Sequence, residues 1–242
     1  MRILIIRHGD PDYAIDGLTD KGKREVALLA DRLELENITA VYCSTYGRAM
    51  RTAEPTLERI GLEAEYCEWL REFNYEKIHV PYQEKEKISW DLLPEYVEGF
   101  ENIYHPTLWR ETDHFKGTGV LEAYDNVCEN FDALIAKHGY ERDGYSYRAV
   151  RPNHDTIALF CHYGVSAILL AHIMHCSPYS PWQHTIIAPT GVTTVCTEER
   201  VEGRASLRVS AIGDTSHLYA GGESPAFSGR FCECFTDSED RH

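Results

Sequence analysis

Arg7 and His8 are the first side chains in the sequence whose types suit catalysis, and Gly9 follows them directly. They come after an unbroken apolar run, residues 3–6, which is typical of a strand buried on both faces. A guanidinium binds phosphate or carboxylate through paired N–H groups, and a neutral imidazole serves as a nucleophile or a base. At the carboxyl end of such a strand, both side chains would lie where open α/β sheets bind ligands. The alternative is a strand end with two solvated polar residues.

The same arrangement recurs twice further along the chain. Residues 38–43 form a second apolar run, and Arg48 comes shortly after it, at the expected start of a helix. Residues 156–161 form another run, and His162 follows it directly, ahead of Gly164. A helix N-terminus offers free backbone N–H groups and the positive end of a dipole, and both favour an anion. The three strand ends together predict one crevice for a small, highly charged anion.

The elements that must position these residues alternate between strand and helix, which is the pattern of an α/β domain. Strands are expected at residues 3–6, 38–43, 64–70, 156–161, 185–188, 192–197 and 207–212. Helices are expected after Thr19 or Asp20, after Arg48, at 121–138 and at 165–174. We therefore predict a single domain over residues 1–242 with three α/β/α layers and a mostly parallel central sheet.

Two segments depart from this alternation. Residues 75–120 lose clear periodicity and are rich in aromatic and charged side chains. We interpret them as an inserted cap that folds over the crevice and carries specificity, the alternative being a packing embellishment without ligand contact. Residues 221–242 are rich in Gly, Ser and acidic residues, and we expect them to form a mobile tail.

The composition limits the partners of the protein. A net charge of −15 argues against a nucleic acid or an acidic membrane as partner. The sequence has no apolar run of about 18 residues and begins without the pattern of a signal peptide. The eight cysteines are scattered and form no pair of C-x-x-C motifs, so we expect free thiols, a cytoplasmic protein and no structural zinc. His172, His175 and Cys176 have ligand-like types, but core or capping roles are the favoured interpretation.

The motifs around these residues resemble those of the histidine phosphatase superfamily, also called the phosphoglycerate mutase-like family. Arg7-His8-Gly9 is similar to the signature of that family. Four further stretches resemble the start of its first helix, its second arginine motif, its second histidine motif and its usual ending: residues 18–22, 44–53, 161–164 and 214–218. The resemblance keeps the family's order and spans nearly the whole chain outside residues 75–120. It implies a phosphoglycerate mutase-like fold.

The resemblance also implies roles for individual residues. His8 would attack phosphorus and become a phosphohistidine. Three side chains would bind the equatorial oxygens and stabilise the charge of the transition state: Arg7, Arg48 and His162. Glu72 would protonate the leaving oxygen and later take a proton from water, with Glu76, four residues on, as the rival acid. This mechanism needs neither a metal ion nor another cofactor.

The reaction itself is either hydrolysis or phosphoryl transfer. Mutases of the family usually have Ser, then Trp and Asn, in the loop after the nucleophile, whereas residues 10–17 contain none of these. We therefore expect a metal-independent phosphatase, of the histidine acid or broad-specificity type, that hydrolyses a small phosphorylated metabolite. The alternatives are a phosphoglycerate mutase-type transferase and a non-catalytic phosphate-binding regulatory protein.

Three further residues are expected to contact the substrate. Asp12 and Tyr13 lie on the loop after the nucleophile, and Tyr163 follows the second histidine. Asp12 equally fits an ordinary turn residue. The expected partner is the small phosphorylated substrate alone, and the oligomeric state is left open, a homodimer being one alternative.

Overall fold

The main sheet of the protein brings strands from both ends of the sequence together. The computed structural model describes residues 1–239. Its largest sheet has eight strands in the order β5-β4-β10-β1-β11-β12-β9-β8. The strands are β1 (Arg2–Arg7), β4 (Ile38–Ser44), β5 (Ala64–Cys67), β8 (Tyr140–Asp143), β9 (Ser146–Ala149), β10 (Thr156–Cys161), β11 (Val192–Val201) and β12 (Arg204–Asp214). β1, β10, β4 and β5 run parallel to one another.

The predicted α/β architecture is confirmed, but the sheet is mixed rather than mostly parallel. β11, β12, β9 and β8 pair antiparallel. Two of these pairs, β8–β9 and β11–β12, are hairpins, whose short connections allow only antiparallel pairing. The parallel half of the sheet carries all the strand ends singled out above.

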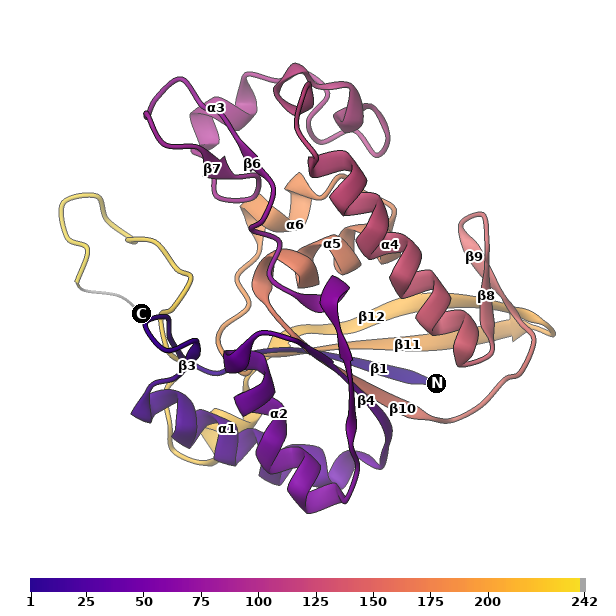
Figure 1. Ribbon diagram of the computed structural model, residues 1–242. Helices are drawn as coiled ribbons and strands as arrows, with labels where there is room; N and C mark the ends of the chain where they lie inside the picture. Colours follow the sequence, from indigo (N-terminus) through magenta and orange to yellow (C-terminus); the bar gives the residue numbers. More distant parts are fainter. Residues whose placement is uncertain (240–242) are drawn as a thin grey trace.

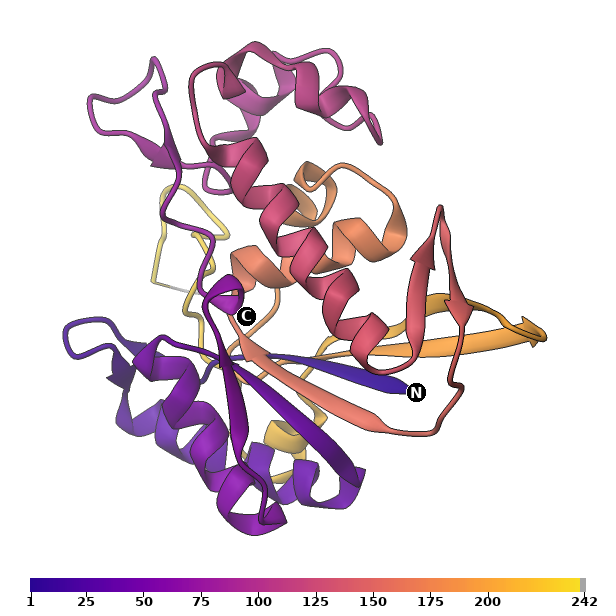
Figure 2. The same ribbon diagram turned by 45° about the vertical axis from the view of Figure 1, so that its right-hand side comes forward.

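Helices cover both faces of the sheet (Figures 1 and 2). One face carries α1 (Asp20–Leu33), α2 (Gly47–Ile60) and α7 (Ser216–Ala220), and the other carries α4 (Val120–Lys137), α5 (Tyr163–Met174) and α6 (Tyr179–His184). The side chains of β1 divide between the two layers, since alternate residues of a strand point to opposite faces. Ile3 and Ile5 pack in the core under α4 and α5, whereas Leu4 and Ile6 pack in the core under α1 and α2. This division explains why the run from residue 3 to 6 is apolar without alternation.

Local signals set the ends of the helices that border the site. The Thr19 hydroxyl caps α1 by accepting a hydrogen bond from the Gly22 N–H. α2 ends at Gly61, which has a φ of 67° and so adopts the left-handed conformation that glycine tolerates. The strand predicted at 185–188 is wrong, because that segment pairs with no strand in the described chain. Its backbone carbonyl groups instead accept hydrogen bonds from site residues, as described below.

Residues 75–120 form a layer beyond α5 and α6, at the top of Figures 1 and 2. Their elements are β6 (Lys77–Ile78), β7 (Lys87–Ile88), α3 (Pro94–Glu98) and the 3₁₀ turns at Leu108–Glu111 and Asp113–Phe115. Ile78, Val97 and Trp109 are buried in the same core as α4 and α5. The remaining short elements are the β2–β3 hairpin (Pro11–Asp12 and Gly17–Leu18) and 3₁₀ turns at Glu34–Glu36 and Glu68–Leu70.

The described part of the C-terminal segment, residues 221–239, starts beside α1 and then extends away from it as the yellow loop at the left of Figure 1. Glu223 accepts hydrogen bonds from Lys21 at 3.0 Å and Arg24 at 2.8 Å, both on α1. Mobility of this segment stays a prediction, and residues 240–242 lie outside the described chain. Among residues 1–239, none of the helices has the length and apolar character needed to span a membrane.

Candidate active site

The carboxyl ends of β1, β10 and β4 meet because these strands are parallel neighbours in the sheet. Arg7, the last residue of β1, pairs in register with Cys161, the last residue of β10. His8 and His162, which directly follow these two strands, have ring centroids 5.0 Å apart. The sequence therefore predicted the juxtaposition of the two histidines correctly.

The His8 imidazole is buried and its tautomer is fixed by the backbone. Its Nδ1 lies 2.7 Å from the carbonyl oxygen of Gly9, so Nδ1 carries the proton and donates it to that oxygen. The Nε2 atom then keeps its lone pair. Burial, reinforced by the positive charge of Arg7, holds the pKa of His8 well below its usual value. His8 is therefore neutral at physiological pH, as a nitrogen nucleophile must be.

Arg7 and Arg48 are both buried and both anchored at one end. Arg7 Nη1 donates to the carbonyl oxygen of Ile187 at 2.5 Å. Arg48 Nη1 donates to Oδ1 of Asp16 at 2.6 Å, and the Gly47 N–H donates to Oδ2 of the same carboxylate, also at 2.6 Å. These anchors fix the direction in which each guanidinium presents its remaining N–H groups.

His162 is oriented by Ser44, the last residue of β4. Its Nε2 lies 2.8 Å from the Ser44 hydroxyl, which also accepts a hydrogen bond from the Tyr46 N–H. With that N–H as its donor, the hydroxyl is free to donate its own proton to Nε2. The proton of His162 then resides on Nδ1, from which it can be donated to a bound anion.

Three buried nitrogen atoms in this crevice have no hydrogen-bond partner within residues 1–239: Nε of Arg7, Nε of Arg48 and Nδ1 of His162. Buried N–H groups are rarely left unpaired, because each costs free energy when removed from water. Three such donors around the His8 imidazole fit the equatorial oxygens of a phosphoryl group. The set can therefore bind a tetrahedral dianion and stabilise the charge that develops when it reacts.

Glu72 supplies a carboxyl group at the edge of the crevice. Its Oε1 accepts hydrogen bonds from the backbone N–H groups of Phe73 and Gly164, each at 2.9 Å. Burial nevertheless raises the pKa of Glu72 above its usual value, against the lowering effect of these bonds and of Arg7. A carboxyl group with a raised pKa holds its proton closer to neutral pH and can act as an acid.

The rival carboxyl group, that of Glu76, lies elsewhere. It packs against Gly119, where an added Cβ would come within 2.6 Å of its Oε2. Gly119 is the residue before α4, at the end of the helix that faces the cap region (Figure 1). The geometry therefore favours Glu72 as the acid.

The three further substrate-binding candidates, Asp12, Tyr13 and Tyr163, are less clearly directed into the crevice. Asp12 accepts a hydrogen bond from the Ala14 N–H, so it serves as a turn residue. Tyr13 is exposed, and its ring centroid lies 5.5 Å from the Arg48 guanidinium. The Tyr163 hydroxyl donates towards the carbonyl oxygens of residues 181, 182 and 185. Any contact of Tyr163 with substrate is therefore through its ring.

Asp16 and Ser44 complete the site and were missed by the sequence reasoning. Asp16 has a φ of 45°, a left-handed conformation that aspartate tolerates better than most residues. In the sequence, only its position directly before Gly17, in the loop that follows His8, distinguishes Asp16 as a possible site residue. Ser44 opens the Ser-Thr-Tyr-Gly-Arg stretch, but nothing in the sequence indicated that its hydroxyl would meet His162.

An Asp16→Asn variant is expected to lower kcat/KM roughly ten- to a hundredfold. One of the two N–H groups now bonded to the carboxylate would face an amide NH₂, and Arg48 would lose its charged anchor. Steady-state kinetics with a phosphomonoester measures this, and most of the loss should fall on KM. Asp12→Asn, on the same loop, is the matched control and should change kcat/KM less than about twofold. Equal effects of the two substitutions would contradict the assigned anchor.

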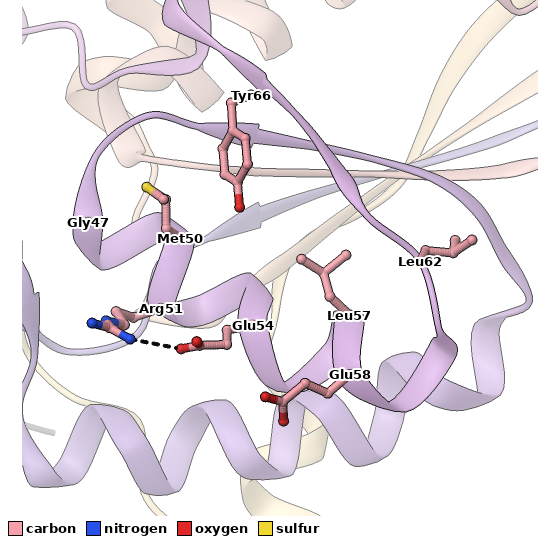
Figure 3. A pocket seen from close by; sticks show the side chains of 8 residues that line it. All are labelled: Gly47, Met50, Arg51, Glu54, Leu57, Glu58, Leu62 and Tyr66. Carbon is pink, nitrogen blue, oxygen red and sulfur yellow. Dashed lines mark hydrogen bonds and ion pairs between the residues drawn. The ribbon is translucent and has the colours of Figure 1, made fainter.

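Two other features of the chain lie apart from this crevice. A hollow on the outer face of α2 and β5, shown in Figure 3, is lined by Gly47, Met50, Arg51, Glu54, Leu57, Glu58, Leu62 and Tyr66. Arg51 is exposed and pairs there with Glu54 at 3.2 Å, as a solvated helix residue does.

His172 lies 3.0 Å from Asp132, and His175 ends α5. Over residues 1–239, no cluster of three metal-ligating side chains is present.

The α/β fold and its paired strand-end histidines define a phosphoglycerate mutase-like protein. The chain belongs to the histidine phosphatase superfamily (branch 1), whose family model matches residues 3–208. A probable phosphatase of Schizosaccharomyces pombe is 25% identical over 235 residues, which cover 90% of this chain and 95% of that protein.

Solved structures show the same fold. A phosphoserine phosphatase mutant from Entamoeba histolytica, in complex with phosphoserine, has 17% identity and a TM-score of 0.58, covering 90% of this chain and 98% of its own. A mycobacterial glucosyl-3-phosphoglycerate phosphatase has 20% identity and a TM-score of 0.58, covering 88% and 98%. A putative alpha-ribazole-5'-P phosphatase from Escherichia coli has 21% identity and a TM-score of 0.55, covering 89% and 98%.

Proposed function

We propose that the protein hydrolyses a small phosphomonoester through a phosphohistidine formed on His8. The observation that carries this proposal is the neutral, buried His8 imidazole with its free Nε2, surrounded by the unpaired nitrogen donors of Arg7, Arg48 and His162. Membership of the histidine phosphatase superfamily and the phosphatases among its structural relatives support hydrolysis as the reaction.

In the first step, the lone pair of His8 Nε2 attacks phosphorus in line with the departing oxygen. The bond between phosphorus and that oxygen breaks, and the oxygen takes the proton of Glu72. The alcohol leaves, and His8 carries the phosphoryl group with its Nδ1–H still donated to Gly9. The carbonyl oxygen of Gly9 stabilises the positive charge that the ring acquires.

In the second step, Glu72 is a carboxylate and accepts a proton from a water molecule. The resulting hydroxide attacks phosphorus, the bond to Nε2 breaks, and inorganic phosphate is released. His8 returns to its neutral state and Glu72 to its protonated state. Neither step requires a metal ion.

Hydrolysis is preferred over mutase chemistry because of the loop that follows the nucleophile. Residues 10–17 lack the Ser, Trp and Asn expected in a phosphoglycerate mutase. The Asp16 carboxylate of this loop accepts hydrogen bonds from Gly47 and Arg48. A non-catalytic phosphate-binding role is disfavoured, because a carboxyl group beside a bound dianion would weaken binding and serves only chemistry.

The thiols support a reducing, cytoplasmic environment as part of the same proposal. Cys43, Cys67, Cys128 and Cys161 are free and buried within the core. Buried free thiols of this kind are usual in proteins of reducing compartments.

Phosphate release from a panel of phosphomonoesters tests the proposed function. We expect stoichiometric inorganic phosphate from at least one ester, at a rate unchanged by dialysis against EDTA. Phosphoglycerates belong in the panel, analysed for both phosphate and isomerised product. Interconversion of phosphoglycerates without net phosphate would reject hydrolysis in favour of the mutase, and tight phosphate binding without any turnover would favour the binding protein.

A further inference from the structure

A second hollow adjoins the catalytic crevice, and we call it the leaving-group chamber. It has a volume of about 580 Å³ and lies between the cap segment 87–94, α6 and the C-terminal segment 229–233. Trp90, Tyr163, Trp182, Ile186, Gly229 and Phe231 are among the residues that line it. Neither step of the proposed mechanism uses the apolar side chains that surround this space.

The chamber is continuous with the reacting groups on two sides. Trp90 lies beside the acid, because a Cβ added at Gly164 would come within 2.5 Å of the Trp90 indole nitrogen and 2.6 Å of Glu72 Oε1. On the other side, a Cβ added at Gly229 would lie 2.7 Å from Nη2 of Arg7. A phosphoryl group held by Arg7, with its leaving oxygen at Glu72, would therefore direct its leaving group into the chamber.

The charged side chains of the chamber lining form ion pairs with one another. Lys87 pairs with Asp91 at 2.9 Å, and Arg230 pairs with Glu233 at 2.5 Å. These are the charged side chains of the lining. A carboxylate or ammonium group on the substrate would have to compete with these ion pairs, whereas an apolar group would not.

The apolar surface of the chamber is large and partly open. Ile186 and Phe231 expose 61% and 72% of their surface, although large apolar side chains are usually buried. Trp182 and Trp90 also line the chamber, and Trp90 packs edge-on against Tyr163 with ring centroids 5.5 Å apart. Exposed apolar surface gathered in one cavity is typical of a ligand site.

Hydrogen bonds hold the C-terminal segment in place just before the residues that line the chamber. The Ala226 N–H donates to Glu25 Oε1 at 3.0 Å, and the other oxygen of Glu25 accepts from the Asp10 N–H at 3.0 Å. The Ser228 hydroxyl donates to the Asp10 carboxylate. Asp10 is two residues after His8, so these contacts fix the segment relative to the nucleophile.

From this arrangement we propose that the substrate's leaving group is uncharged and aromatic or bulky and apolar, and that Phe231 selects it. The inference rests on the proposed phosphatase function and specifies its substrate class. Phe231 would contact the leaving group in the chamber that Trp90 and Trp182 also line. The C-terminal segment thus forms one wall of the specificity pocket, together with the cap.

Three primary alkyl phosphates with different leaving groups test the substrate class: 2-phenylethyl phosphate, O-phosphoserine and 3-phosphoglycerate. We expect kcat/KM for 2-phenylethyl phosphate to exceed both others at least tenfold. Equal or faster hydrolysis of the charged esters would overturn the inference and leave the proposed phosphatase intact. Phosphate release from no ester in this set or in the wider panel would overturn both.

Phe231→Ala and Phe235→Ala test the selecting residue as a matched pair from the same segment. Phe235 is 97% exposed and lies outside the chamber lining. Phe231→Ala should lower kcat/KM for 2-phenylethyl phosphate roughly five- to tenfold, mainly through KM, because an aromatic contact is lost. It should change kcat/KM for O-phosphoserine less than about twofold, and Phe235→Ala should change neither. A parallel loss on both esters, or none on the aromatic one, would overturn the role of Phe231.

Discussion

A His8→Ala variant is expected to lose at least about 10⁴-fold in kcat on every phosphomonoester that the wild-type protein hydrolyses. The substitution removes the Nε2 lone pair of His8, which is proposed to attack phosphorus. The anion-binding side chains remain, so the variant should still bind inorganic phosphate. Initial rates of phosphate release, measured alongside phosphate binding by calorimetry, check both expectations.

The matched control for this variant is His172→Ala. His172 is a partly buried histidine on α5 that bonds to Asp132 and not to the crevice. It should retain kcat within about twofold once folding is verified by circular dichroism. If His8→Ala kept activity within tenfold of wild type, His8 would not be the nucleophile.

A Glu72→Gln variant is expected to lose about 10²- to 10³-fold in kcat/KM on 2-phenylethyl phosphate. An alkoxide is a poor leaving group and needs the proton of Glu72, which glutamine cannot supply. p-Nitrophenolate leaves without protonation, so the first-turnover burst with p-nitrophenyl phosphate should fall less than about fivefold. Stopped-flow absorbance measures that burst separately from the slower hydrolysis of the phosphoenzyme.

The pH dependence of the wild-type rate tests independently whether Glu72 is the general acid. The first step needs protonated Glu72, and burial raises its pKa, so kcat/KM on the alkyl ester should fall as pH rises through that pKa. In Glu72→Gln this descending limb should disappear, whereas Glu76→Gln should keep both the limb and the rate. If Glu72→Gln lost equal activity on the alkyl and aryl esters, the general acid would be another group.

The sequence predicted the parts of the site that depend on strand order and residue type. Arg7, His8 and His162 were correctly gathered, because each lies at the end of an apolar run and the corresponding strands are parallel neighbours. The first helix was expected to begin after Thr19 or Asp20, and the structure selects Thr19 as its N-cap through a local hydrogen bond from the Gly22 N–H.

The parts that the sequence could not predict depend on long-range contacts of the backbone. The Ile187 carbonyl that anchors Arg7 is separated from it by 180 residues, and a carbonyl group carries no residue type that a sequence pattern could reveal. The strand expected at 185–188 failed for the same reason, because an apolar Ile-Ile pair fits a strand locally. Asp16 was missed because its role depends on the fold of its loop against α2.

The arrangement of the C-terminal segment was also beyond the sequence. Its composition is that of a mobile end, yet residues 223–228 contact α1 and the loop that follows the nucleophile. Those contacts join positions about two hundred residues apart, including Glu25 and Ala226. Only the fold shows that the segment borders the catalytic crevice.

Direct capture of the phosphoenzyme tests the central claim, that His8 carries the phosphoryl group during turnover. The protein would be mixed with p-nitrophenyl phosphate, quenched in alkali within milliseconds, and its peptides analysed by mass spectrometry under alkaline conditions. We predict one phosphoryl group on His8, stable to base and labile to acid, that forms at least as fast as steady-state turnover and is absent from His8→Ala. Steady-state hydrolysis without a phosphorylated His8, or with the label on another residue, would contradict the account.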